Sequence, residues 1–107
     1  MDLLPPSSPS PASATAQAIT HRPEASRFEI ALDAGLGWCA YRRQGDDVLL
    51  LTHTEVPVSL EGRGIAAALV RATLAWARAE GLRVRPLCGY IAAYMRRHPE
   101  THDLLQA

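Results

Sequence analysis

The sequence predicts one α+β domain in which three strands precede a helix, a fourth strand and a second helix. Three observations predict this class. The chain has 107 residues, enough for a single domain. Apolar residues alternate with polar or small ones over Phe28, Ile30 and Leu32, as in a strand, and recur at every third or fourth position from Ile65, as in a helix. A strand, a helix and a further strand in succession favour a right-handed crossover between parallel strands. The order β-β-β-α-β-α therefore indicates a mixed sheet with helices packed on it.

The first 23 residues are expected to form a disordered tail. They are rich in Pro, Ser, Ala and Thr, and residues 5–11 read PPSSPSP. Such a segment buries too little apolar surface to offset its backbone entropy. The folded domain is accordingly expected to span residues 24–107.

Three strands are predicted at the start of this domain, over 26–32, 36–43 and 48–56. Turns that contain Gly and Asp join them. The third strand begins with a continuous apolar run, which favours burial on both faces and a central position in the sheet. Pro57 ends it, because proline has no N–H to donate to a neighbouring strand.

The helical pattern from Ile65 is predicted to end at Gly81, a typical residue after a helix C-terminus. Residues 82–88 are predicted to be a short strand parallel to the third, and 89–98 a second helix.

Charge and cysteine content exclude several classes. The chain has 11 basic and 11 acidic residues, so it lacks the cationic excess of a nucleic-acid-binding protein. Cys39 and Cys88 are too few for a disulfide-stapled secreted domain, and with the histidines they do not form a metal-binding spacing. The sequence contains no membrane-spanning run and no signal-peptide pattern. We expect a cytoplasmic protein with neither a nucleic-acid nor a membrane partner.

The junction between the third strand and the first helix is a candidate anion site. Gly62 and Gly64 lack Cβ atoms, so backbone N–H groups can approach a phosphate closely. The first-turn N–H groups of the helix are unsatisfied, and its dipole favours negative charge. Arg63 can add a charge-assisted contact. A plain flexible turn before a helix is the alternative.

The junction also resembles a known motif. Val56-Pro57, then Gly62 to Ala66 and a Leu/Val-rich helix, resemble the acetyl-CoA-binding motif Q/R-x-x-G-x-G/A of the GNAT superfamily of N-acetyltransferases. In this comparison Gly62 and Gly64 take the two glycine positions and Ser59 the first position. With residues 53–57 and Cys88, the pattern is similar to the small stand-alone GNAT-like group described as N-acetyltransferase domain-containing, over about residues 25–106.

The resemblance implies a cofactor, acetyl-CoA or CoA, bound where the third and fourth strands diverge. Its pyrophosphate would lie on the N–H groups of about residues 62–67, which begin with Gly62–Gly64, the glycine loop. Its pantetheine arm would run along Glu55-Val56 like an added strand. The implied cofactor-binding residues are Val56, Gly62, Arg63, Gly64, Ile65, Ala66 and Ala67. The acceptor would be a small-molecule or protein amine. Full-size members have further acceptor-binding elements that we do not expect here, so the acceptor and the oligomeric state stay open.

His53 and Glu55 are candidate catalytic bases. They lie two residues apart in a strand, so they share one face near the expected cofactor cleft. Either can take a proton from an ammonium acceptor, directly or through water. A packed or exposed strand histidine and a solvated carboxylate are the alternatives.

Cys88 and Tyr94 complete the predicted catalytic set. Cys88 ends the fourth strand just before a helix, whose N-terminus favours a thiolate that could accept the acetyl group. The alternative for this cysteine is a small buried hydrophobe. In full-size GNAT members a tyrosine on the helix after this strand protonates the CoA thiolate. Tyr94 is the first match and Tyr90 the second, and core packing is the alternative for both.

Two functions from different classes therefore remain. The first is an acetyl-CoA-dependent N-acetyltransferase acting on an amine. The second is a non-enzymatic acyl-CoA-binding or protein-interaction module on the same fold.

Overall fold

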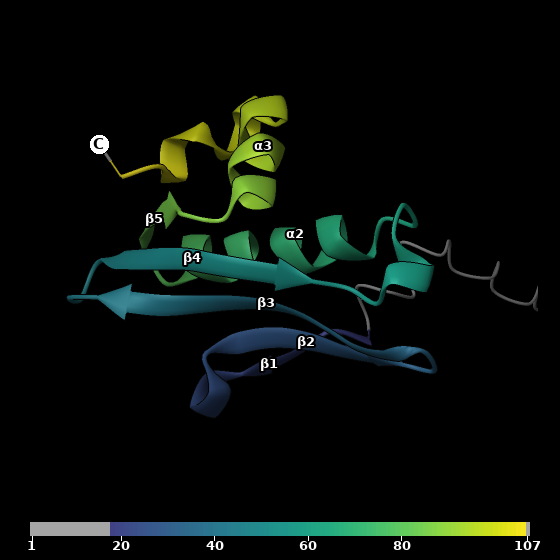
Figure 1. The fold of residues 1–107 in the computed structure, drawn as a ribbon. Helices are drawn as coiled ribbons and strands as arrows, with labels where there is room; N and C mark the ends of the chain where they lie inside the picture. The colour runs from purple at the N-terminus through teal and green to yellow at the C-terminus, as the bar shows by residue number, and fades with distance from the viewer. Residues whose placement is uncertain (1–17, 107) are drawn as a thin grey trace, which may run out of the picture.

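A computed structural model describes residues 18–106 of the chain and contains one five-stranded sheet (Figure 1). The strands lie in the order β1-β2-β3-β4-β5, with antiparallel pairing throughout β1–β4 and parallel pairing between β4 and β5. Their bounds are β1 Thr20–Arg22, β2 Arg27–Leu32, β3 Gly35–Gln44, β4 Val48–Glu55 and β5 Arg83–Pro86. The α+β class is confirmed, and the strand predicted to be central, β4, has a neighbour on both sides.

Two helices cover one face of this sheet. They are α2 Ile65–Ala79 and α3 Gly89–Arg97, and short 3-10 turns occupy η1 Pro23–Ala25, η2 Val58–Leu60 and η3 Pro99–Leu104. Buried residues of both helices form one core cluster with Leu49 and Leu51 of β4. In Figure 1, α2 runs behind β4. Within residues 18–106 no helix covers the other face, which we call the open face.

The N-terminal boundary corrects the sequence prediction. Residues 20–22 were expected to belong to a disordered tail, but they pair with β2 as the edge strand β1. The cause is His21, whose ring stacks on Phe28 at 4.1 Å between centroids. Its Nε2 also lies 2.5 Å from the hydroxyl oxygen of Tyr41, and its ring lies 4.5 Å from that of Trp76. This aromatic burial anchors the strand. Residues 1–17 of the expected tail lie outside the described residues.

A β-bulge in β4 determines which side chains face the helices. Ala40 of β3 pairs with His53, whereas the next residue of β3, Tyr41, pairs with Leu51. Thr52 is therefore the extra residue, and the alternation of side chains shifts by one position after it. Leu51 faces the helices before the bulge, and Thr54 faces them after it. His53 and Glu55, the neighbours of Thr54 in the strand, therefore lie on the open face.

The burial of His21 predicts a pH-dependent stability. Desolvation lowers the pKa of His21 below its ordinary value of 6.5, although the carboxylates of Glu24 and Glu80 oppose the shift. Below about pH 6.5 the unfolded chain then binds a proton more readily than the folded chain, so the free energy of unfolding falls as the pH falls. We expect His21→Phe, which keeps the ring stacking and cannot titrate, to flatten this slope in chemical denaturation between pH 7.5 and 5. His98→Gln should retain it, and an unchanged slope in His21→Phe would contradict the assignment.

Candidate active site

The candidate site begins where β4 and β5 separate. Their parallel pairing ends at Leu51 and Pro86, and the N–H groups of Leu87 and Cys88 both donate to the Leu51 carbonyl, at 2.9 and 3.1 Å. The chain then turns into α3, while β4 continues through residues 52–55. Along those residues the β4 edge toward β5 has no strand partner within residues 18–106. Unpaired backbone groups at such an edge can pair with an extended ligand.

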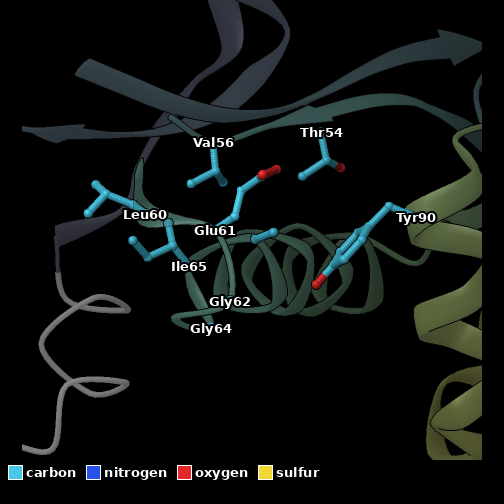
Figure 2. A pocket seen from close by; sticks show the side chains of 9 residues that line it. Thr54, Val56, Leu60, Glu61, Gly62, Gly64, Ile65 and Tyr90 are labelled. Atoms are coloured by element: carbon cyan, nitrogen blue, oxygen red, sulfur yellow. The ribbon is translucent and has the colours of Figure 1, made fainter. Parts of the chain in front are cut away.

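A cavity of about 360 Å³ lies beside this edge on the helix-covered face. It is lined by Thr54, Val56, Leu60, Glu61, Gly62, Gly64, Ile65, Ala66 and Tyr90 (Figure 2). The residues come from the end of β4, from η2, from the glycine loop, and from the first turns of α2 and α3. The volume falls within the range of small-molecule sites.

The glycine loop offers a row of free backbone donors. Gly62 and Gly64 both have φ +81°, a left-handed conformation that favours glycine, and no heavy atom lies within 4 Å of where a Cβ would stand. The first α-helical hydrogen bond runs from the N–H of Ala68 to the Gly64 carbonyl, and no side chain caps the helix. Within residues 18–106 the N–H groups of residues 62–67 thus have no acceptor. This geometry fits a phosphate group.

The apolar lining fits the rest of a CoA molecule, but one residue does not fit its charge. Val56, Leu60 and Ile65 supply apolar surface for a pantetheine arm. Figure 2 shows the Glu61 carboxylate pointing into the cavity, toward Thr54. A carboxylate there repels a diphosphate, so Glu61 opposes the ligand that the loop favours.

The structure also changes how the Q/R-x-x-G-x-G/A pattern aligns. Ser59, assigned to the first position, does not line the cavity, whereas Glu61 does. Shifting the alignment by two residues places Glu61, Gly64 and Ala66 at the three defined positions, and all three line the cavity. In this alignment an acidic residue stands where the pattern has Gln or Arg.

Five of the seven predicted cofactor-binding residues line the cavity, and two do not. Arg63 is exposed to solvent outside the lining. The side chain of Ala67 packs against the hydrophobic core, because it lies on the buried side of the first turn of α2. Only its backbone N–H is available to a ligand. Thr54, Leu60 and Glu61 were missed. Nothing in the sequence indicates the bulge that turns Thr54 toward the cavity, or how η2 places Leu60 and the following Glu61.

His53 and Glu55 lie together on the open face. The Nε2 atom of His53 is 3.0 Å from Oε1 of Glu55, and each side chain is about half exposed, at 54% and 53%. The Trp38 ring lies next to the imidazole, with 6.2 Å between centroids. The pair therefore faces away from the cavity, on the other side of the same unpaired edge of β4.

Cys88 lies beside Thr54 and packs against the hydrophobic core. It is the N-cap residue of α3, is partly buried, and has its Sγ 4.0 Å from Oγ1 of the cavity residue Thr54. It does not itself line the cavity.

The structure places the two candidate tyrosines in different surroundings. Tyr94 is 3% exposed, stacks on His98 at 4.0 Å, and contributes to a separate groove between α2 and η3. It lies one helical turn, about 6 Å, farther along α3 than Tyr90 and so does not reach the cavity. Tyr90, the second choice from the sequence, lines the cavity. Burial of its phenol raises the pKa of Tyr90 above its ordinary value, against the opposing effect of Arg97.

Comparison with known proteins agrees with this architecture. A family model described as GCN5-related N-acetyl-transferase matches residues 27–104. The chain belongs to the GCN5-related N-acetyltransferase family. The NMR solution structure of a GCN5-like protein from Staphylococcus aureus superposes with a TM-score of 0.68 at 22% identity, over 83% of this chain and 87% of that one. At this identity the similarity shows a shared fold.

Curated relatives of this GCN5-related chain cover a shorter stretch. Protein NATD1 of Homo sapiens is 39% identical over 59 residues, which is 55% of this chain and 52% of the relative. Protein NATD1 of Gallus gallus is also 39% identical over 59 residues, 55% of this chain and 54% of the relative. The chain thus matches about half the length of these relatives. Among residues 18–106, no helix is both long and apolar enough to span a bilayer.

Proposed function

We propose that the protein is an acetyl-CoA-dependent N-acetyltransferase acting on an amine. One observation carries the proposal: the unpaired edge of β4 and the free N–H groups of the glycine loop border one cavity. Acetyl-CoA needs both features, because its pantetheine amides require hydrogen-bond partners and its diphosphate requires donors. Membership of the GCN5-related family supports this assignment.

Acetyl-CoA, when bound, would supply the activated acetyl group as a thioester. The N–H groups of residues 62–67 would hold the diphosphate, and the β4 edge over residues 52–55 would pair with the pantetheine arm. Val56, Leu60 and Ile65 would exclude water from that arm.

His53 is the base in this proposal and Glu55 its positioning residue. The N–H at Nε2 donates to the Glu55 carboxylate, which leaves the lone pair at Nδ1 free to accept a proton from an ammonium acceptor. The carboxylate then stabilises the imidazolium, as in other histidine–carboxylate pairs. Both side chains are on the open face, where an acceptor can reach them.

Tyr90 replaces Tyr94 as the proposed proton donor to the departing CoA thiolate. Its raised pKa keeps the phenol protonated near neutral pH, as an acid requires. Cys88 remains a candidate nucleophile. Attack of its thiolate on the thioester carbonyl would form an S-acetyl cysteine and release the CoA thiolate.

A non-enzymatic acyl-CoA-binding or protein-interaction module is the second candidate. Of its two forms, the Glu61 carboxylate favours the protein-interaction module. Its repulsion of the diphosphate weakens the CoA binding that both acetyl transfer and acyl-CoA binding need.

Alanine substitutions at two glycines test the cofactor site. Gly64 and Gly45 both have positive φ, +81° and +68°, and both have open space around a Cβ. An alanine at either position therefore costs a similar strain, about 1 kcal/mol. Only at Gly64 would the new methyl group enter the cavity.

We expect Gly64→Ala to weaken CoA binding at least about tenfold in isothermal titration, and Gly45→Ala to leave it unchanged. Equal affinities in the two variants would show that the loop assignment is wrong. Absence of CoA binding by the wild type at high micromolar concentration would refute the cofactor proposal itself.

A further inference from the structure

Two arginines lie in one row on the open face. Leu50 of β4 pairs with Arg42 of β3 on one side and with Arg85 of β5 on the other. Cross-strand neighbours have Cβ atoms about 5 Å apart and project from the same face, so the two arginines flank Leu50. Arg43, the next residue of β3, points to the opposite face, where its guanidinium lies 5.6 Å from the Trp76 ring centroid.

Within the described part of the chain, no acidic side chain neutralises Arg42 or Arg85. Arg22 and Arg27, farther along the same face, both form ion pairs with Glu29, at 3.1 and 2.8 Å. Arg42 and Arg85 are exposed and form no ion pair and no side-chain hydrogen bond within residues 18–106. The chain is neutral overall, but this row carries two free positive charges.

The low exposure of Leu50 indicates how the side chains of Arg42 and Arg85 lie. It is 8% exposed although no helix covers its face, and it lies outside the core cluster. Its cross-strand neighbours are the two arginines, whose aliphatic stems can cover it while their charged ends stay in water. The row therefore presents an apolar centre between two guanidinium groups, which can bind carboxylates in a bidentate manner.

The row lies at a fixed distance from the proposed base. Because Thr52 is the extra residue of the bulge, Leu50 and His53 lie opposite Arg42 and Ala40, which are two residues apart in β3. At a rise of about 3.3 Å per residue, this separation is about 7 Å. Ala40 pairs with His53 and has a small side chain, so the sheet surface beside His53 is low. Arg42, Leu50 and His53 line none of the three pockets at the glycine loop, between α2 and η3, and beside β5, and no helix within residues 18–106 covers their face of the sheet. A flat surface suits an extended peptide better than a small molecule, which needs a concave site.

We propose that the open face binds an acidic peptide segment of a protein acceptor, with its carboxylates on Arg42 and Arg85 and its amine at His53. The inference rests on the proposed acetyltransferase function for the role of the amine. The binding of the acidic segment itself needs no cofactor, so it can be measured separately.

The test uses two labelled peptides in fluorescence anisotropy without CoA. Each has one central lysine. The first has glutamates two and four residues to each side, and the second has glutamines there. We expect the glutamate peptide to bind the wild type at least about tenfold more tightly at low salt. Arg42→Gln combined with Arg85→Gln should abolish the preference. Arg42→Gln alone should weaken it, and Arg43→Gln, which removes one positive charge from the opposite face, should retain it.

Several outcomes would overturn the proposal. Equal binding of the two peptides would do so, as would a preference that persists in the double variant. A dimer seen in sedimentation that dissociates in the double variant would assign the face to a second copy of the chain. Stronger competition by a single-stranded oligonucleotide than by the glutamate peptide would indicate a nucleic-acid ligand. A wild type that binds the peptide but not CoA would refute the proposed function and leave the acidic-segment site intact.

Discussion

His53→Ala is expected to lower kcat for acetyl transfer about 10²-fold or more, with little change in CoA affinity. A positioned general base contributes about 10²- to 10⁴-fold to such a reaction. The imidazole is on the open face, away from the cavity, so its removal leaves the proposed cofactor contacts in place. The measurement is CoA release with the best acceptor of an amine panel, combined with titration of CoA.

The chain contains a matched control for this variant. His98 and Glu100 form a second histidine–glutamate pair two residues apart, with Nδ1 and Oε2 at 3.1 Å. That pair lies beyond the C-terminus of α3, outside the cavity lining. His98→Ala should therefore retain kcat. Because the His53 side chain is 54% exposed, added imidazole can reach the vacated position and should restore part of the activity of His53→Ala. Equal losses in the two variants, or no rescue, would remove His53 from the catalytic role.

The sheet and helices were predictable because their signals are local. The alternation that includes Phe28 and Ile30, the apolar start of β4 and the helical spacing from Ile65 each reflect burial of one face. The strand β1 was not predictable from its own residues. It is held by contacts between the His21 ring and side chains on β2, β3 and α2, which are distant in sequence.

The candidate site was predictable only where backbone geometry defines it. The glycine loop follows from glycine spacing and from the start of a helix, and the structure places it at the cavity. The bulge at Thr52 leaves no composition signal, although it decides that Thr54 faces the cavity and His53 the open face. The choice between Tyr90 and Tyr94 depends on one turn of α3 relative to the cavity, which sequence spacing alone does not define.

Glu61→Arg is expected to tighten CoA binding by about tenfold or more. The present carboxylate points into the cavity that the loop prepares for a diphosphate. At an effective dielectric constant of about 20, like charges a few ångströms apart repel by several kcal/mol, and solvent exposure of Glu61 reduces this to about 1–2 kcal/mol. Replacement by arginine removes the repulsion and adds a charge-assisted donor.

Graded variants separate the two contributions. Glu61→Gln removes only the repulsion and should tighten CoA binding by a smaller factor than Glu61→Arg, and both gains should shrink as salt is added. Asp46→Arg makes the same change in net charge in the turn between β3 and β4, outside the cavity lining, and should leave CoA affinity unchanged. Weaker CoA binding by Glu61→Gln would mean that the carboxylate accepts a hydrogen bond from the ligand instead of repelling it. In that case the acidic residue would be part of the binding site, and the diphosphate would lie farther from it than the loop geometry indicates.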